Sequence, residues 1–225
     1  MKKFALIFTL AIITALPSVA QIKLGVSLEP QISWFGTDRK AIKGDGSIGG
    51  VSFGLNVDRY FAKQYAFYTG VFIETTGGYL KYQNGTTIHS KDTPNFAVKP
   101  NGSVKYRTQY ISIPTGIKLK TNPIGYNSFY AILGFKTSLR MRTKGFTNDG
   151  KNSSGINSMD GEVLKNQTEW ANLGYQLGVG TEYSLGNSVS LLLGITYNNG
   201  ITNTMDDENV HVNLNNLSLK LGVMF

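Results

Sequence analysis

The segment Leu217-Ser-Leu-Lys-Leu-Gly-Val-Met-Phe225, at the end of the chain, decides the fold. Its odd positions are all apolar, whereas Ser218, Lys220 and Gly222 among the even positions are polar or small. Alternation with a period of two over this length predicts a β-strand that has one apolar face and one polar face. We interpret it as the closing strand of a transmembrane β-barrel, in which Lys220 faces the lumen and Leu221 faces lipid.

Seven earlier segments show the same alternation, so the chain as a whole predicts an all-β fold. Glycine is frequent, with 26 residues, and Tyr and Phe contribute 12 each, a composition that favours strands and turns. The apolar face is continuous over about five or six positions per strand, which matches the length of about 9–11 residues that a tilted strand needs to span a bilayer. The eight segments cover approximately residues 22–34, 47–58, 65–83, 104–121, 127–143, 166–185, 188–198 and 212–225.

The connections between these segments alternate in length, as they do in outer-membrane barrels, whose short turns face the periplasm. We therefore predict an eight-stranded antiparallel up-and-down transmembrane β-barrel with both the N and C termini on the periplasmic side. Because the long loops are rich in Asn, Gly, Ser, Asp and Lys, we expect them to be solvated. The short turns are residues 59–64, 122–126 and 186–187, and the long loops are residues 35–46, 84–103, 144–165 and 199–211.

Alternation alone does not decide which face points outward, because a soluble lipocalin-like barrel would enclose its apolar face around a ligand. We favour the polar face inside, since it carries charges of both signs and many Gly and Ser residues, which suit a narrow eight-stranded lumen. We expect Glu74 and Glu182 to face Lys136 and Arg140 across this lumen, as a paired polar plug rather than a path for protons or ions. The predicted lumen charge network is Glu29, Glu74, Lys118, Lys136, Arg140 and Glu182.

Residues 1–20 have the pattern of a secretory signal peptide, with Lys2 and Lys3, an apolar run over residues 4–16 and small residues before Gln21. Cleavage there would leave residues 21–225 as one outer-membrane β-barrel domain. The loss of two lysines and no acid lowers the formal net charge from +8 to +6. The remaining cations are scattered singly in an exported chain, which argues against nucleic-acid binding. The chain has no cysteine, which excludes disulfides, thiolate metal sites and a lipid anchor at the cleavage site.

Aromatic residues gather at both ends of the predicted strands, as in the interfacial girdles of membrane barrels. Trp34 lies beside a long loop at the outer rim, whereas Tyr65, Phe129, Tyr183 and Phe225 lie near the short turns. We therefore predict that these five side chains lie at the two membrane interfaces.

Pro114 interrupts a predicted central strand, although proline cannot donate to a β-ladder. We expect a β-bulge or a missing hydrogen bond there, with Gly116 close by to ease it. A continuous, fully paired ladder through residues 112–116 would contradict this expectation.

The middle of the chain resembles a known family. Tyr110-Ile-Ser-Ile-Pro-Thr-Gly-Ile-Lys118 is similar to the Tyr-Leu-Glu-Ile-Pro-Leu-Leu-Leu-Lys signature of PorT-like outer-membrane β-barrel proteins, and residues 129–134, 177–183 and 195–203 resemble the blocks that follow it. The resemblance implies a barrel in the cell outer membrane, and the family's named member is an accessory of a protein-secretion and gliding system. Ser112 stands where the family often has Glu, so the role of that carboxylate is not carried over.

The terminal residues Leu221, Val223 and Phe225 resemble the signal that the barrel-assembly machinery reads in such proteins. The resemblance therefore implies contacts with this machinery, with outer-membrane lipid and with lipopolysaccharide. On a rigid barrel, the long extracellular loops are the natural surface for protein partners.

Residues suited to catalysis or metal binding are few. His89 with Ser90, and His211 with the acidic run at residues 206–208, would be the candidates in a lipid-modifying enzyme, but neither lies on a recognisable motif at a strand end. The acidic run could also hold Ca²⁺, although its spacing is not that of an EF-hand loop. We therefore predict no catalytic, cofactor-binding or metal-binding residues, and a binding, scaffold or accessory function in a secretion or envelope complex. A narrow pore and an outer-membrane lipid-modifying enzyme are the alternatives.

Overall fold

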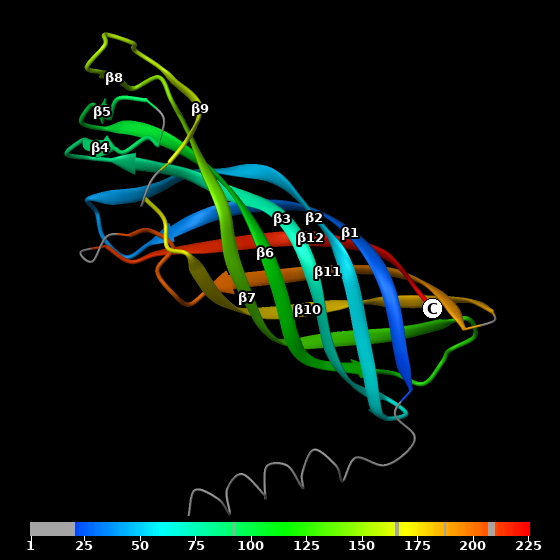
Figure 1. The fold of residues 1–225 in the computed structure, drawn as a ribbon. Helices are drawn as coiled ribbons and strands as arrows, with labels where there is room; N and C mark the ends of the chain where they lie inside the picture. Colours follow the sequence, from blue (N-terminus) through cyan, green and yellow to red (C-terminus); the bar gives the residue numbers. More distant parts are fainter. Residues whose placement is uncertain (1–20, 92, 165–166, 187, 207–209) are drawn as a thin grey trace, which may run out of the picture.

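The fold is all β, and eight long strands wind around a common axis (Figure 1). The computed structural model describes residues 21–91, 93–164, 167–186, 188–206 and 210–225. The predicted leader at residues 1–20 lies outside this part of the chain, as do Asp207 and Glu208 of the acidic run. No helix among the described residues is long and apolar enough to cross a membrane. The long strands are β1 (Ile22–Thr37), β2 (Ile42–Ala62), β3 (Tyr65–Tyr82), β6 (Gly102–Lys120), β7 (Asn127–Thr147), β10 (Ala171–Gly186), β11 (Val189–Gly200) and β12 (Val212–Met224).

These eight strands form a closed ring of antiparallel neighbours. The strands follow one another around the ring in chain order, and β12 returns to pair with β1. At this closing seam Leu28 lies opposite Leu221, and the backbones of Leu24 and Phe225 exchange hydrogen bonds of 3.0 and 2.8 Å. The predicted eight-stranded up-and-down barrel is therefore confirmed, with residues 217–225 as its closing strand.

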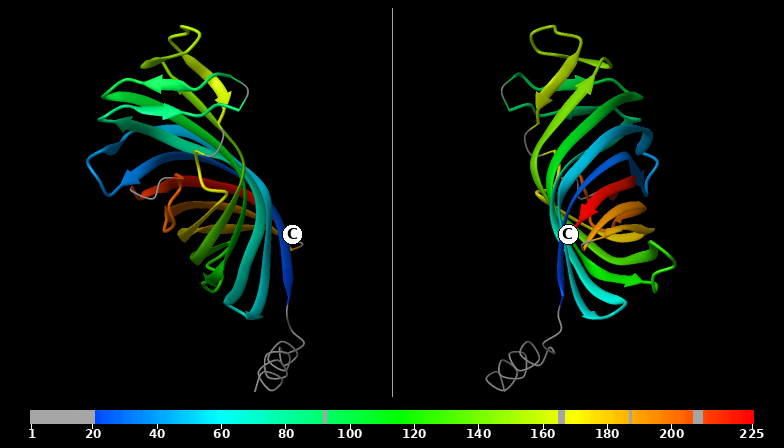
Figure 2. Two further views of the ribbon diagram at one scale, coloured as in Figure 1. Left: turned by 60° about the vertical axis from the view of Figure 1, so that its left-hand side comes forward. Right: turned by 90° about the vertical axis from the view of Figure 1, so that its right-hand side faces the viewer.

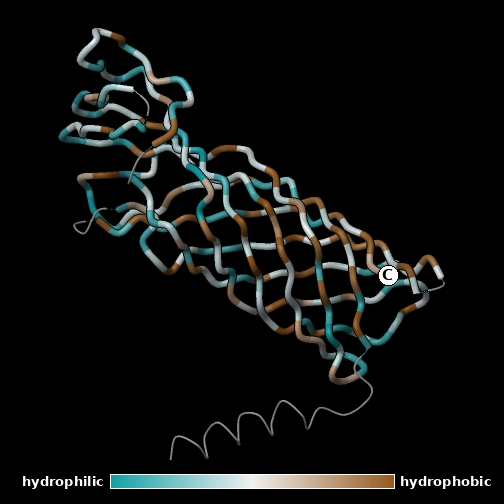
Figure 3. The backbone as a smooth tube through the Cα atoms, viewed as in Figure 1, coloured by the Kyte–Doolittle hydropathy of each residue, from teal (hydrophilic) through white to brown (hydrophobic). Residues whose placement is uncertain are grey.

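The apolar face of each strand points outward and the polar face points into the lumen. Leu221 exposes 39% of its surface, whereas its neighbour Lys220 exposes 2% and Ser218 exposes 3%. Figure 3 shows this alternation as hydrophobic and hydrophilic residues that follow one another along the strands of the barrel wall. An apolar outer surface of this kind is stable in hydrocarbon only if the backbone groups are paired, and the closed ring provides that pairing.

The long loops are not solvated throughout, and this part of the prediction is wrong. β2, β3, β6 and β7 continue beyond the other strands, and the segments that follow β3 and β7 fold as four short strands (Figures 1 and 2). Of these, β4, β5 and β8 form a three-stranded sheet, whereas β9 pairs with β7. We call the four short strands the outer platform. They are β4 (Thr86–Ile88), β5 (Phe96–Val98), β8 (Gly150–Asn152) and β9 (Met159–Val163).

The outer platform folds because its larger buried apolar side chains meet in one core. Ile88, Phe96, Val98 and Met159 are buried and belong to one apolar cluster with residues from the outer ends of the long strands. The composition of the loops does not predict this core, because polar residues separate its apolar members along the chain. The platform is thus a packed extension of the barrel rather than a set of wet loops.

Pro114 leaves a local gap in the ladder between β3 and β6. Thr69 pairs with Thr115 and Phe72 pairs with Ser112, but the two residue pairs between them are skipped while the register continues unchanged. The hydroxyl of Thr69 donates instead to the Pro114 carbonyl at 2.9 Å. The expected interruption is present on this side, without a bulge. The register shift of β6 lies elsewhere, at Gln109 and Tyr110.

Replacing Leu221 by Lys should lower the free energy of unfolding by about 2–4 kcal/mol, because Lys on the lipid face near the bilayer midplane is costly. The matched control is Leu185→Lys, at an exposed position next to the β10–β11 turn, where the cost falls to about 0–1 kcal/mol. Reversible urea unfolding in lipid vesicles measures both costs. Equal costs at the two positions would contradict the outward direction and the depth of Leu221.

Candidate functional site

The lumen is filled by three clusters of charged side chains, and the first lies near the periplasmic end. The Lys118 ammonium donates a hydrogen bond of 2.6 Å to Asp58 and forms an ion pair with Glu182, whose other oxygen contacts Lys120. The ring of Tyr130 lies 4.8 Å from Lys118 Nζ, a favourable cation–π contact. Because β3 separates β2 from β6, and β7 separates β6 from β10, these ion pairs cross the lumen.

The second cluster surrounds Lys220, next along the lumen. Its ammonium lies 3.1 Å from the Glu29 carboxylate and donates hydrogen bonds of 2.8 Å to Asn56 Oδ1 and to the Tyr68 hydroxyl. The Tyr68 hydroxyl in turn donates to Asn56 Oδ1 at 3.2 Å. The amide of Asn56 also bonds to the hydroxyl of Ser27. The closing strand is therefore tied through its one lysine to β1, β2 and β3.

The third cluster is centred on Glu74 of β3. Its carboxylate accepts a hydrogen bond of 3.0 Å from Lys136 of β7 and further bonds from the hydroxyls of Ser112 and Ser138. β6 separates β3 from β7, so this pair also spans the lumen. The structure thus brings Glu74 and Lys136 together as the sequence predicts.

Arg140 forms an ion pair with neither Glu74 nor Glu182, so its predicted place opposite these carboxylates is wrong. Its guanidinium donates to the carbonyl and to the hydroxyl of Thr168, the latter at 2.7 Å. The register explains the difference, because Glu182 lies opposite Ser128 at the periplasmic end of β7, far along the strand from Arg140. Arg140 instead joins a layer of hydroxyl groups, in which Thr143 contacts Thr168 at 2.9 Å.

Three charged residues of these clusters are missing from the predicted network: Asp58, Lys120 and Lys220. The alternation of side chains between the two faces of a strand could have identified them. Asp58 shares the inward face of Asn56, and Lys120 shares that of Lys118, so the sequence alternation already directs both side chains inward. Lys220 is predicted to face the lumen, but its partners on three other strands depend on the register.

An apolar cluster closes the outer end of the lumen, and we call it the outer cap. It combines buried side chains of the long strands with the buried core of the outer platform and with Met205 and Val210 of the β11–β12 connection. Within it the hydroxyls of Tyr82 and Tyr106 lie 2.6 Å apart.

Little space is left between the charged clusters. A cavity lined by residues that include Glu74, Lys136 and Gln176 offers about 20 Å³ to the centre of a water molecule, which is room for one water. Glycines allow this packing. A Cβ added at Gly180 or Gly194 would lie 2.5 or 2.4 Å from the hydroxyl oxygen of Tyr130.

The predicted interfacial aromatics lie at the two ends of the outward face. At the outer end, the rings of Trp34 and Tyr197 stack with centroids 6.4 Å apart, and Tyr197 meets Tyr175 at the same separation. Near the short turns, the rings of Tyr126 and Tyr183 lie 6.1 Å apart. The exposed aromatics of that end include Phe61, Tyr65, Phe67, Tyr126, Phe129, Tyr183 and Phe225.

Both histidines lie outside the lumen clusters. His89 is exposed between β4 and β5, and His211 precedes β12 with its Nε2 at 3.1 Å from the Ile201 carbonyl oxygen. The backbone N–H of His211 donates to the carboxylate of Asp38 at 3.1 Å. Within the described ranges, no group of three or more His, Cys, Asp or Glu residues is placed to hold a metal ion.

Replacing Lys118 by Met should destabilise the barrel by about 3–5 kcal/mol, because Asp58 and Glu182 would lose the buried cation between them. The control, Lys63→Met, removes the same charge from an exposed turn and should change stability by at most about 0.5 kcal/mol. Both values come from reversible urea unfolding in vesicles. If the two variants unfold alike, the cluster does not support the ring.

Comparison with known proteins gives one family match. The family described as outer membrane protein beta-barrel domain matches residues 18–206. No curated protein sequence is similar enough to the chain to be matched.

Solved structures of small bacterial barrels are also similar. Neisserial surface protein A has 13% identity and a TM-score of 0.48, covering 90% of this chain and 95% of that one. Ail of Yersinia pestis, crystallised with sucrose octasulfate, has 14% identity and a TM-score of 0.43, covering 91% and 99%. OprG of Pseudomonas aeruginosa has 9% identity and a TM-score of 0.46, covering 92% and 96%. Neighbours this distant say nothing about the function of the chain.

Proposed function

Because the chain belongs to the outer membrane protein beta-barrel domain family and lies in the outer membrane, we propose that it is a closed barrel that acts by binding partners. In this role the barrel is a scaffold or accessory component, and the outer platform carries the binding surface. The side chains in the lumen stabilise the closed ring and hold the outer platform in position.

The observation that carries this proposal is the set of buried ion pairs in the lumen, of which those of Lys118 and Lys136 join strands that are not neighbours. Lys118, Lys136 and Lys220 each bind a carboxylate on another strand, and all three ammonium groups are largely buried. An ion moving through the lumen would have to displace these pairs and then pass the outer cap. Both steps expose buried charge or open packed apolar contacts, and each is costly.

The outer platform supports the binding role, because it is a rigid surface held away from the membrane. Its buried core anchors β4, β5 and β9 to the barrel. The segment between β8 and β9 presents Ile156, an apolar side chain with 55% of its surface exposed. Loops on a rigid scaffold are a common location for recognition.

The finer assignment to the PorT-like proteins, and with it an accessory role in secretion, rests on the resemblance of residues 110–118. Contacts with the barrel-assembly machinery rest on the resemblance of Leu221, Val223 and Phe225 to its terminal signal. We propose no catalytic role, because the contact formed by the ring of His211 is to a backbone carbonyl and His89 is exposed on the platform.

In planar lipid bilayers the purified barrel should give no reproducible unitary current steps. Glu74→Ala/Lys136→Ala should be silent as well, because the Lys118 cluster and the outer cap still close the two ends of the lumen. Steps of constant size in the wild-type recordings would support a narrow pore instead.

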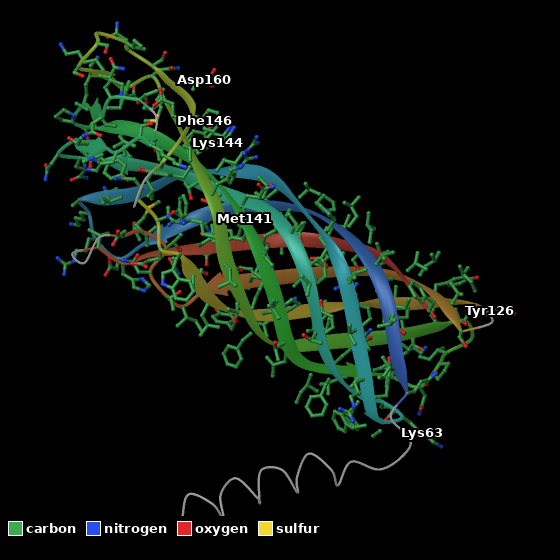
Figure 4. All side chains as sticks on the ribbon, viewed as in Figure 1. Lys63, Tyr126, Met141, Lys144, Phe146 and Asp160 are labelled. Atoms are coloured by element: carbon green, nitrogen blue, oxygen red, sulfur yellow. The ribbon has the colours of Figure 1, made fainter. Side chains whose placement is uncertain are left out.

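A photo-crosslinking amino acid at Ile156 should capture a protein partner in native outer membranes. The same amino acid at Tyr126, which is exposed in a short turn at the opposite end, is the matched control (Figure 4). We expect a discrete crosslinked product that is specific to the Ile156 position. Identical products at both positions, or none at Ile156, would contradict a partner at the outer platform.

A further inference from the structure

Four cations lie side by side on the outward face of β6 and β7, just beyond the apolar band. We call Lys105, Arg107, Arg142 and Lys144 the cationic belt. Arg142 follows directly after Met141, whose exposed side chain is part of the apolar face. Figure 4 shows Met141, Lys144 and Phe146 in succession along β7 toward the loop end of the barrel.

A β-bulge creates the belt. Gln109 pairs with Arg142 and Tyr110 pairs with Arg140, so Met141 is the extra residue of β7. An extra residue reverses the parity of a strand. Arg140 therefore points inward to Thr168, whereas Arg142 and Lys144 point outward.

The cations of the belt repel one another and are not neutralised by ion pairs among the described residues. Arg107 lies directly opposite Lys144, a like-charge pair that destabilises a sheet. A second like-charge pair, Lys43 opposite Lys81, continues the positive surface onto β2 and β3. Among the described residues, no carboxylate forms an ion pair with any of these cations. Two neighbouring cations of this kind are stabilised when an anion lies between them.

The residues around the cationic belt indicate which class of anion it binds. Below it the face of β6 and β7 is apolar and exposed, with Ile113, Phe135, Leu139 and Met141 suited to acyl chains. Beside it Lys105 Nζ lies 5.4 Å from the ring of Phe146 and 5.8 Å from that of Tyr79. Cations directly above this apolar face are suited to a lipid that has anionic groups on its headgroup and acyl chains below them.

We propose that the cationic belt binds the phosphate groups of lipopolysaccharide in the outer leaflet, with the acyl chains along the apolar strip below. Arginine binds phosphate through two parallel hydrogen bonds, and lysine adds a point charge. The site rests on the outer-membrane location and on the belt itself, and it does not require a closed lumen. Bound lipid would fix the rotation and depth of the barrel and so hold the outer platform at a constant height.

The test is a binding titration of the purified barrel in detergent with lipid A that carries its phosphates, and with the same lipid after enzymatic removal of the phosphates. Removing the phosphates should weaken binding about tenfold or more at low salt, and added salt should narrow the difference. The Arg107→Glu/Lys144→Glu variant should bind phosphorylated lipid A more weakly than the wild type, by a similar factor. Arg59→Glu/Lys63→Glu, which makes the same charge change at the periplasmic end, should bind like the wild type.

A single variant separates lipid binding from folding. Arg107→Glu places opposite charges across the β6–β7 pair, so its melting temperature in lipid-free detergent should stay the same or rise while lipid affinity falls. Equal binding of phosphorylated and dephosphorylated lipid, or wild-type binding by the Arg107→Glu/Lys144→Glu variant, would overturn the proposal. A conducting lumen would refute the proposed closed barrel and leave these titrations unaffected.

Discussion

An eight-stranded ring encloses a space only wide enough for side chains, so each inward group must find its partner within the wall that surrounds it. The polar face of this chain meets that constraint with ion pairs and charge-assisted hydrogen bonds, most of which join strands that are not neighbours. Lys118 joins three strands and Lys220 joins four, counting their own. The same groups that make the strands amphipathic therefore also close the ring around them.

This constraint separates what the sequence could predict from what it could not. Alternation was sufficient for the outward direction of Leu221 and the inward direction of Lys220, since a period of two assigns a face to each residue. It was not sufficient for the partner of Glu182, which depends on distance along the strand. Glu182 lies a few residues before the turn at Gly186 and Lys118 a few residues before the turn after Lys120, so both belong near the periplasmic end. Counting from the turns would have favoured this pair over Arg140.

The outer platform lay beyond such reasoning for a different reason. Its strands are three to five residues long, and none contributes more than two buried apolar side chains. No periodicity can be read from segments of that length, and their core forms only when they meet the ends of β3 and β6. The bulge at Met141 was hidden in the same way, because the alternation of β7 gives no sign of where its parity reverses. Arg140, before the bulge, keeps the inward direction of Ser138, whereas the reversal turns Arg142 toward the lipid surface.

The claim that cross-lumen ion pairs hold the barrel closed is tested most directly by a double-mutant cycle on Glu74 and Lys136. Glu74→Gln, Lys136→Met and the double variant would be unfolded reversibly by urea in the same vesicles as the wild type. The account predicts that the two single losses exceed the loss in the double variant by about 1 kcal/mol or more, because each single change leaves one buried group without its partner. Free energies of unfolding that simply add would contradict it.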